Sequence, residues 1–185
     1  MLTLVRVTND PRPTDRVPFL LSQVGARVSS VWVDLLATTG VPPRCYAVLA
    51  HLAAHGARTQ QQLCDALGVH RNAMVGLVDE LEQSGWATRH LTPRDRRVHE
   101  VQLTSSGAQV VRQVDALTPG LEARATADLD DTERDQLRAL LRRVADTLEL
   151  TPGVHPHLQQ LPRHLPEPSH TDAVNQVTRP MGERP

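Results

Sequence analysis

Residues 59–81, TQQQLCDALGVHRNAMVGLVDEL, contain two short apolar series with one glycine between them. Before Gly68, Leu63 and Leu67 lie four residues apart. After it, apolar residues follow at the helical spacing i, i+3, i+4 and i+7, namely Met74, Leu77, Val78 and Leu81. Each series places its apolar side chains on one face of a helix, and glycine favours the turn that separates them. The stretch therefore predicts a helix-turn-helix.

A strand pair with a basic tip is expected directly after these helices. Residues 86–103, WATRHLTPRDRRVHEVQL, contain two short alternating runs on either side of a charged loop. We expect Asp95 to stabilise this loop by pairing with Arg97. Arg94 and Arg96 are then expected, with Arg97, to contact phosphates or a narrow minor groove. A solvated turn is the alternative explanation for the same arginines. With the helix pair, the ribbon predicts a winged helix that binds nucleic acid.

Composition and charge exclude several classes of protein. A length of 185 residues favours one domain with appendages, and a net charge of -1 means that any nucleic-acid affinity must come from local clusters. The low aromatic content, 2%, argues against a single-strand binder that stacks bases. No apolar run reaches the roughly 20 residues of a membrane span. Neither a nucleophile–base set nor a phosphate loop is present in the sequence, so we predict no enzyme and no cofactor.

The two cysteines, Cys45 and Cys64, lie in segments that are expected to be helical and have no zinc-binding spacing. We therefore predict a reduced, cytoplasmic protein, with Cys64 as a packed thiol. A redox role for Cys45 stays open. His51 and His55 lie four residues apart, which is a metal-ligand spacing, but two histidines alone form a weak site and we predict no metal.

Caps and breaks set the expected helix boundaries. The first helix is expected over residues 17–38. Thr59 and Asp130 each have Gln or Glu three residues later, which predicts a capping box at the start of two further helices. Thr104 is expected to cap a long helix, which the Pro-Gly pair at residues 119–120 should break or kink.

In a helix-turn-helix, the start of the second helix enters the major groove, where its exposed side chains meet base edges and phosphates. We predict that DNA contacts are made by His70, Arg71, Asn72 and Val75. Arg71 suits guanine or phosphate, Asn72 suits adenine, and His70 lies beside the free N–H groups of the helix start. The alternative is that these are solvated helix residues without a DNA partner.

Residues 42–107 resemble the MarR family of bacterial transcription regulators. The resemblance rests on the wing motif of Asp95 and Arg97, on LVDELEQSGW and on LTSSG, and it extends over roughly residues 17–149. It implies a homodimer with interlocked N- and C-terminal helices, whose recognition helices enter successive major grooves of a near-palindromic operator. Gly76, where relatives commonly have arginine, and His70, where a Ser or Asp cap is common, depart from the family pattern.

The predicted fold is mainly α with a small β-wing, a winged helix-turn-helix with N- and C-terminal dimerisation helices. The expected organisation is a flexible arm over residues 1–16, a winged-helix domain over 17–149 and a disordered Pro- and His-rich tail over 150–185. Within the domain, residues 17–38 and 105–149 should form the dimerisation helices and residues 42–104 the DNA-binding part. The first and last helices have apolar stripes too wide for a small domain to cover alone, which also favours a dimer.

The resemblance also implies a small aromatic or anionic effector, bound in a cleft between the dimer helices and the winged part. By position, the cleft is expected to be bordered by Trp32, Arg44, Tyr46 and His51, with Arg44 as the partner of a carboxylate. Core packing or plain exposure is the alternative for each. We therefore predict a ligand-responsive repressor that binds double-stranded DNA as a homodimer. The alternative function is a dimeric interaction or ligand-binding module without specific DNA reading, which Gly76 and the acidic Asp79, Glu80 and Glu82 favour.

Overall fold

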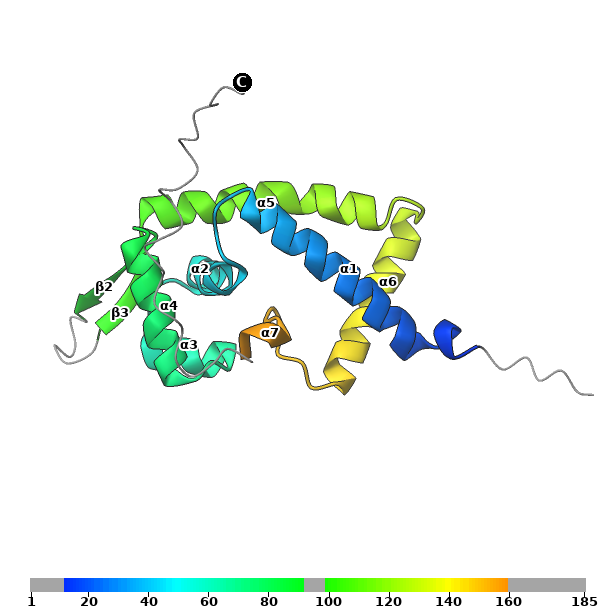
Figure 1. The fold of residues 1–185 in the computed structure, drawn as a ribbon, viewed down its shortest axis with the longest axis horizontal. Helices are drawn as coiled ribbons and strands as arrows, with labels where there is room; N and C mark the ends of the chain where they lie inside the picture. Colours follow the sequence, from blue (N-terminus) through cyan, green and yellow to red (C-terminus); the bar gives the residue numbers. More distant parts are fainter. Residues whose placement is uncertain (1–11, 92–98, 160–185) are drawn as a thin grey trace, which may run out of the picture.

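The computed structural model describes residues 12–91 and 99–159 (Figure 1). In chain order its elements are η1 (Pro13–Asp15), α1 (Val17–Ala37), α2 (Pro43–His55), β1 (Arg58–Thr59), α3 (Gln60–Leu67), α4 (Arg71–Gln83), β2 (Ala87–Leu91), β3 (His99–Leu103), α5 (Ser105–Ala125), α6 (Asp131–Thr147) and α7 (Pro156–Gln159). Of the expected arm, the described part contains η1. The mainly helical fold with a small β-wing is confirmed.

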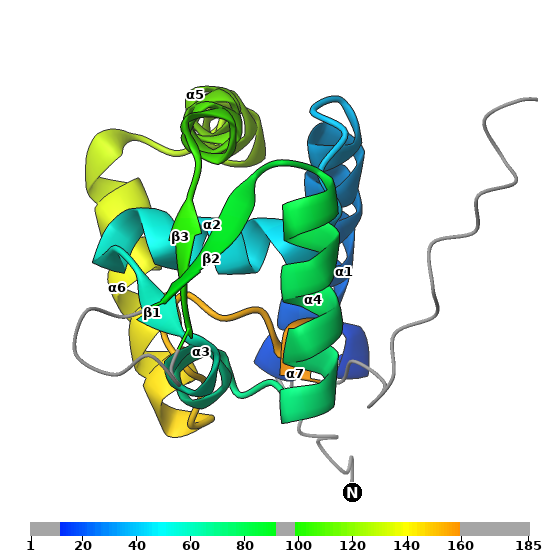
Figure 2. The ribbon, with the colours of Figure 1, turned by 90° about the vertical axis from the view of Figure 1, so that its left-hand side faces the viewer.

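The fold has two regions, the head and the outer helices. The head, residues 43–103, contains α2, α3, α4 and the sheet, and it lies at the left of Figure 1. The outer helices, α1 and α6, lie away from it, and α5 runs from the head along the top to join them. In a view turned by 90° from that of Figure 1, the sheet lies in front of α2, with α4 beside it and α3 below it (Figure 2).

The sheet is a three-stranded antiparallel sheet in the order β1-β3-β2. Ala87 pairs with Leu103 and Leu91 with His99, which fixes the register of the ribbon. The short strand β1, which the sequence did not predict, pairs Arg58 with Val101. Strand β1 therefore joins the middle of the ribbon, at Glu100 and Val101, to the residues that precede α3.

The head has a continuous apolar core. The helical spacing around Gly68 is confirmed, because the predicted face of α4 is buried and α3 ends at Gly68 in a left-handed conformation with φ 65°. The largest fully buried side chains of the head are Leu49, Leu63, Met74, Leu77, Leu81, Val48, Val78, Val101 and Cys45. This core fixes α4 against α2 and the sheet.

Both predicted capping boxes are present. The Thr59 hydroxyl accepts from the Gln62 amide at 3.2 Å, and the Gln62 side chain accepts from the Thr59 amide at 2.9 Å. Asp130 and Glu133 form the same reciprocal pair at 2.8 and 2.9 Å. Each box satisfies N–H groups that a helix start leaves without a backbone partner.

The start of α5 is packed directly against the head. Thr104 caps the helix by accepting from the Gly107 amide at 3.0 Å, and its hydroxyl donates to the Gly85 carbonyl at 2.7 Å. A Cβ atom at position 107 would lie 2.0 Å from the carbonyl oxygen of Trp86. Only glycine therefore allows this approach, which explains the last residue of the LTSSG motif.

Of the break or kink expected at residues 119–120, the break is wrong. Helix α5 continues through Pro119 to Ala125. Proline removes one backbone hydrogen bond of the helix, and one turn earlier the Thr118 hydroxyl donates to the Val114 carbonyl at 3.0 Å. The loss of a single bond within a helix of 21 residues does not end it.

The beginning of the expected disordered tail is ordered, which corrects that part of the prediction. After a turn at Gly153, with φ 73°, the chain folds back and forms α7. Leu158 is 5% exposed and belongs to the apolar core, with Val154 packed against it. The composition predicted disorder, but Val154 and Leu158, four residues apart, pack against apolar side chains of the rest of the fold. Residues 160–185 lie outside the described part.

Candidate nucleic-acid interface and effector cleft

The start of α4 is capped by a histidine. The His70 ring nitrogen Nδ1 accepts a hydrogen bond from the Asn72 amide at 3.2 Å. This is the role that Ser or Asp commonly has at a helix start. Although His70 departs from the common Ser or Asp, the N-terminus of α4, where DNA contacts are predicted, still has a side-chain cap.

The predicted reading face is exposed. His70, Arg71 and Asn72 are exposed, and Val75 is 39% exposed, whereas the intervening Ala73 is buried. The alternation follows from the helical period, because the opposite face of α4 packs into the head. The four side chains form one surface of the described part.

The acidic residues further along α4 are paired with arginines of the head. Arg89 of β2 donates to Asp79 at 2.7 Å and also pairs with Glu82, whose carboxylate accepts from the Arg89 amide at 2.7 Å. Glu80 accepts two hydrogen bonds from Arg44 of α2. Each carboxylate therefore has a cationic partner within the protomer, which reduces its repulsion of a nearby phosphate.

The tip of the wing lies outside the described residues. The predicted contacts of Arg94, Arg96 and Arg97 and the predicted pairing of Asp95 with Arg97 all fall in residues 92–98. The strands β2 and β3 end on either side of this segment, with Leu91 opposite His99.

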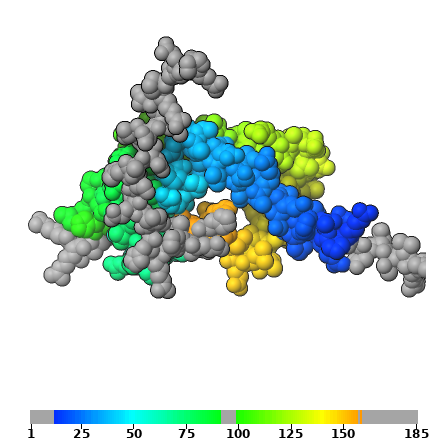
Figure 3. Space-filling model, viewed as in Figure 1, coloured from blue at the N-terminus to red at the C-terminus, as the bar shows by residue number. Residues whose placement is uncertain are grey.

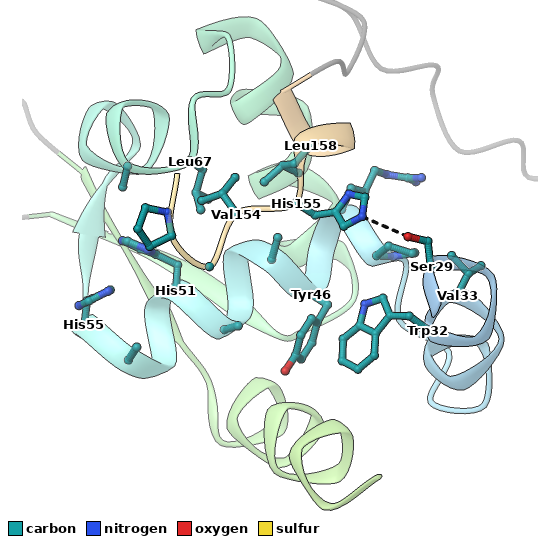
Figure 4. A pocket seen from close by; sticks show the side chains of 18 residues that line it. Ser29, Trp32, Val33, Tyr46, His51, His55, Leu67, Val154, His155 and Leu158 are labelled. Carbon is teal, nitrogen blue, oxygen red and sulfur yellow. Dashed lines mark hydrogen bonds between the residues drawn. The ribbon is translucent and has the colours of Figure 1, made fainter. Parts of the chain in front are cut away.

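A cleft of about 680 Å³ lies between α1, α2, α3 and residues 152–158. In the space-filling view, the C-terminal part of the described chain lies in a hollow below α1 (Figure 3). The sequence-predicted cleft residues all line this cleft, namely Trp32, Arg44, Tyr46 and His51. The structure thus brings together side chains from α1 and α2 that the sequence placed there by position only (Figure 4).

Aromatic side chains form one wall of the cleft. The Trp32 and Tyr46 rings make an edge-to-face contact, with centroids 5.6 Å apart. The Tyr46 hydroxyl donates to the carboxylate of Asp115 in α5 at 3.2 Å. Burial, together with the negative charge of Asp115, raises the pKa of Tyr46 to about 12, so the phenol is neutral at pH 7.

Arg44 is engaged in a bidentate ion pair. Its Nε donates to Glu80 Oε2 at 3.1 Å and its Nη2 to Glu80 Oε1 at 2.8 Å. These hydrogen bonds raise the pKa of the guanidinium. Glu80 therefore offsets the charge of Arg44 and occupies two of its N–H donors, which weakens the predicted attraction of Arg44 for a ligand carboxylate.

His51 and His55 lie side by side on α2, with ring centroids 4.4 Å apart. Burial lowers the pKa of His51, and His55 and Arg58 lower it further, which favours the neutral ring. Within residues 12–91 and 99–159, no group of three or more His, Cys, Asp or Glu side chains is placed to hold a metal ion.

Both cysteine thiols are buried and reduced. Cys45 is 0% exposed, and burial raises its pKa, with Glu80 adding to the effect. Burial also raises the pKa of Cys64. Because the thiolate is the reactive form, these surroundings are those of structural cysteines and disfavour a redox role for Cys45.

Sequence reasoning missed several residues of the two regions. The sequence did not show that Arg89 pairs with Asp79 and Glu82, which lie ten and seven residues away in the chain. The cleft also includes Ser29 and residues 152–155 with Leu158. The one signal for this segment was the spacing of Val154 and Leu158, which is short and lies among prolines and histidines.

None of the helices in the described ranges combines the length and apolar character that crossing a membrane requires.

A helix-turn-helix followed by a two-stranded ribbon, with the start of its second helix exposed, defines a protein of the winged-helix class.

Comparisons with known proteins agree with the assignment to the winged-helix class and identify the family. A sequence profile of the MarR family matches residues 39–98. The chain is similar to a crystal structure of a MarR family transcriptional regulator from Rhodococcus sp. RHA1, with 30% identity over 72% of this chain and 95% of the other, at a TM-score of 0.61. The chain belongs to the MarR family, whose members are transcriptional regulators and not enzymes.

Further relatives have a described function or ligand. A putative transcriptional regulatory protein for the hcr operon of Thauera aromatica is 32% identical over 107 residues, which are 58% of this chain and 64% of the relative. CouR from Rhodococcus jostii RHA1, bound to p-coumaroyl-CoA, is 32% identical over 71% of this chain and 93% of CouR, with a TM-score of 0.59. A point mutant of MarR from E. coli in complex with operator DNA is 25% identical over 71% of this chain and 96% of the mutant, with a TM-score of 0.61.

Proposed function

We propose that this protein is a ligand-responsive repressor that binds a near-palindromic operator as a homodimer. Its reading residues are His70, Arg71, Asn72 and Val75 at the start of α4. The wing arginines, Arg94, Arg96 and Arg97, contact phosphates or the minor groove beside it.

One observation carries this proposal. The first turns of α4 expose Arg71, Asn72 and Val75, while the acidic residues further along the helix are paired with arginines of the head. A phosphate backbone that approaches α4 therefore meets a polar helix start and neutralised carboxylates. This weakens the alternative of a module without DNA reading, which rested on those same carboxylates. The E. coli MarR mutant that binds operator DNA has the same fold.

Exposed apolar side chains support the homodimer. On α1, Val17 and Val24 are 63% and 60% exposed, and on α6 no residue is buried. A monomer rarely leaves such stripes in water, and two copies related by a twofold axis bury them together. A twofold axis relates the two copies of α4 to each other, which favours two related half-sites in the operator.

An effector site is supported by the cleft. Its volume of about 680 Å³ and its aromatic wall suit a small organic molecule. CouR, a relative of similar fold, binds p-coumaroyl-CoA. In our proposal the effector occupies the cleft between α1 and α2 and changes the position of the head relative to α1.

The test is a fluorescence anisotropy titration of the protein against DNA from its own upstream region, at two salt concentrations and beside a scrambled duplex. Each phosphate neutralised adds about 0.9 to the slope of log affinity against log salt, so we expect a steep slope. Asn72→Ala should lower the preference for the operator over the scrambled duplex. The double change of Arg96 and Arg97 to Ala should weaken binding to both duplexes. A shallow salt slope with equal affinity for both duplexes would leave the interaction module as the function.

A further inference from the structure

Residues 152–158, here called the strap, connect two parts of the fold that are distant in the chain. The His155 Nε2 lies 3.4 Å from the Ser29 hydroxyl oxygen of α1, the bond drawn in Figure 4. Inside the strap, the Leu158 amide donates to the His155 carbonyl at 2.9 Å. The strap therefore has a defined conformation at the point where it meets α1.

The apolar side chains of the strap face the head. Leu158 is 5% exposed and joins the same core as Leu67 of α3, and Val154 packs against that core. Figure 4 shows Val154 and Leu158 beside Leu67, on the side of the cleft opposite Tyr46. The strap thus spans from α1 to α3 and closes one side of the cleft, while leaving the volume of about 680 Å³ open.

Three histidines line this volume, His51, His55 and His155, and the one permanently charged side chain beside it is already paired. Among the lining residues that the structure describes, Arg44 is the single Lys or Arg, and its guanidinium is bound by Glu80. Tyr46 is neutral at pH 7, since burial raises its pKa further above its ordinary value of 10, and burial lowers the pKa of His51 in the direction of the neutral ring. The Tyr46 hydroxyl already donates to the carboxylate of Asp115, so this donor is occupied as well.

We propose that the strap is the outer wall of the effector site and that the enclosed site takes an uncharged aromatic molecule, packed against Trp32. The inference rests on the proposed function, in which the cleft binds an effector. An anionic ligand would lose its hydration without gaining a free cation, whereas a neutral ring loses little and gains the aromatic wall.

The charge preference is tested with two probes that share one ring system. N-phenyl-1-naphthylamine is neutral, and 8-anilinonaphthalene-1-sulfonate has the same rings with a sulfonate. We expect the neutral probe to bind more tightly by about tenfold or more, which corresponds to about 1.4 kcal/mol. Trp32→Phe should remove the part of the probe emission that is excited through the Trp32 ring, which locates the probe in the cleft.

Glu80→Gln separates the charge effect from simple hydrophobicity. This change frees Arg44, so the affinity for the sulfonate should rise about fivefold relative to the neutral probe. The matched control is Glu82→Gln, which removes the same charge from the same helix but at a residue paired with Arg89 outside the cleft. Equal shifts in the two variants, or a wild-type preference for the sulfonate, would overturn the proposed ligand class.

The strap is tested with Leu158→Asp against Leu158→Met, each in the full chain. As a wall, the strap slows the escape of the bound probe, so the dissociation rate should rise about tenfold in the Asp variant and stay within about twofold in the Met variant. A strap that merely blocks the cleft gives the opposite result, tighter binding in the Asp variant, and overturns the proposal. If the Asp variant does not fold, His155→Ala, which removes the bond to Ser29, should still raise the rate about threefold, and an unchanged rate overturns the wall.

The failure of this inference and the failure of the proposed function give different results. If the protein binds its operator with the expected preference but the probe dissociation rate does not change in the Leu158 variants, the strap is not a wall of the site and the regulator function stands. If the probe results change with Leu158 and Glu80 as expected but the protein shows no operator preference, the enclosed site stands and the regulator function is wrong.

Discussion

The head and the outer helices differ in where their apolar side chains lie. In the head, Leu63, Met74 and Leu77 are fully buried within one protomer. In the outer helices, Val24 of α1 is 60% exposed and Leu140 of α6 is 54% exposed, although both segments have amphipathic patterns just as clear. Burial of apolar surface is the main stabilising contribution to a fold, so the head is complete in one chain and the outer helices are not.

An apolar stripe at helical spacing can therefore belong either to a buried core or to an exposed surface. An apolar stripe on α4 packs inside the chain, whereas the stripe on α6 stays exposed within one protomer, which is where our proposal places a second copy. The connection between the two regions is α5, whose start packs against Trp86 of the head and whose end is tied to α6 by the Arg138–Glu122 ion pair at 2.8 Å. Changes in the head should therefore affect folding, and changes in the outer helices should affect assembly.

The largest effect is expected for Gly107→Ala at the junction of α5 with the head. The added Cβ would lie 2.0 Å from a backbone oxygen of Trp86, so the helix start must move, at a cost of about 3 kcal/mol in the free energy of unfolding. Urea titration measures this loss. The control is Gly120→Ala in the same helix, where no atom lies within 4 Å of the added Cβ and stability should increase by about 1 kcal/mol. A similar gain in stability at both positions would show that helix propensity, and not packing against Trp86, decides the outcome.

Leu140→Asp on α6 should disrupt assembly without unfolding the head. A charge placed in the apolar stripe is buried by dimer formation, so we expect the dissociation constant of the dimer to rise by about 100-fold or more. Sedimentation equilibrium measures it. Ala139→Asp adds the same charge to the opposite side of α6 and should leave the assembly unchanged. An unchanged mass for the Leu140 variant would place the dimer interface elsewhere.

Arg89→Ala should weaken operator binding by about tenfold with a smaller effect on stability. The change leaves Asp79 and Glu82 without their cationic partner on α4, the helix that we propose reads the DNA. Anisotropy titration against the operator measures the loss. Adding Asp79→Asn and Glu82→Gln to the variant should restore most of the affinity. Lack of restoration would mean that Arg89 itself contacts the DNA.

The smallest effect is expected for His51 and concerns pH. The pKa of His51 is lowered below its ordinary value of 6.5, mainly by burial, so the unfolded chain binds the proton more tightly than the folded one. The stability is therefore unaffected by this group above its unfolded pKa of 6.5 and decreases as the pH falls through that value toward the lowered folded pKa. His51→Gln should make the melting temperature less dependent on pH in that window, as followed by circular dichroism. Identical slopes for the two proteins would contradict the assignment.

Much of the fold could be predicted because it rests on local chemistry. The capping boxes at Thr59 and Asp130, the turn at Gly68 and the buried face of α4 are confirmed. Each depends on residues within a few positions of one another, which the sequence displays directly. The break expected at Pro119 is wrong, because α5 continues through the proline, which costs the helix one backbone hydrogen bond.

The candidate site was predictable only in part. The exposure of Arg71 and Asn72 follows from helical periodicity. The pairing of Arg44 with Glu80 does not, because these residues lie 36 positions apart and meet through the packing of α2 on α4. The wing arginines remain a prediction, since residues 92–98 lie outside the described part.

The sequence by itself determined the helix-turn-helix, the ribbon, the caps and the family, because spacing and capping act over a few residues. The tertiary structure decided which charges are neutralised and what encloses the cleft. Arg89 reaches Asp79 and Glu82 across the head, and the strap reaches Ser29, 126 positions earlier in the chain. Such contacts depend on how whole elements pack, and no periodicity in a linear sequence encodes the distance between two side chains on different helices.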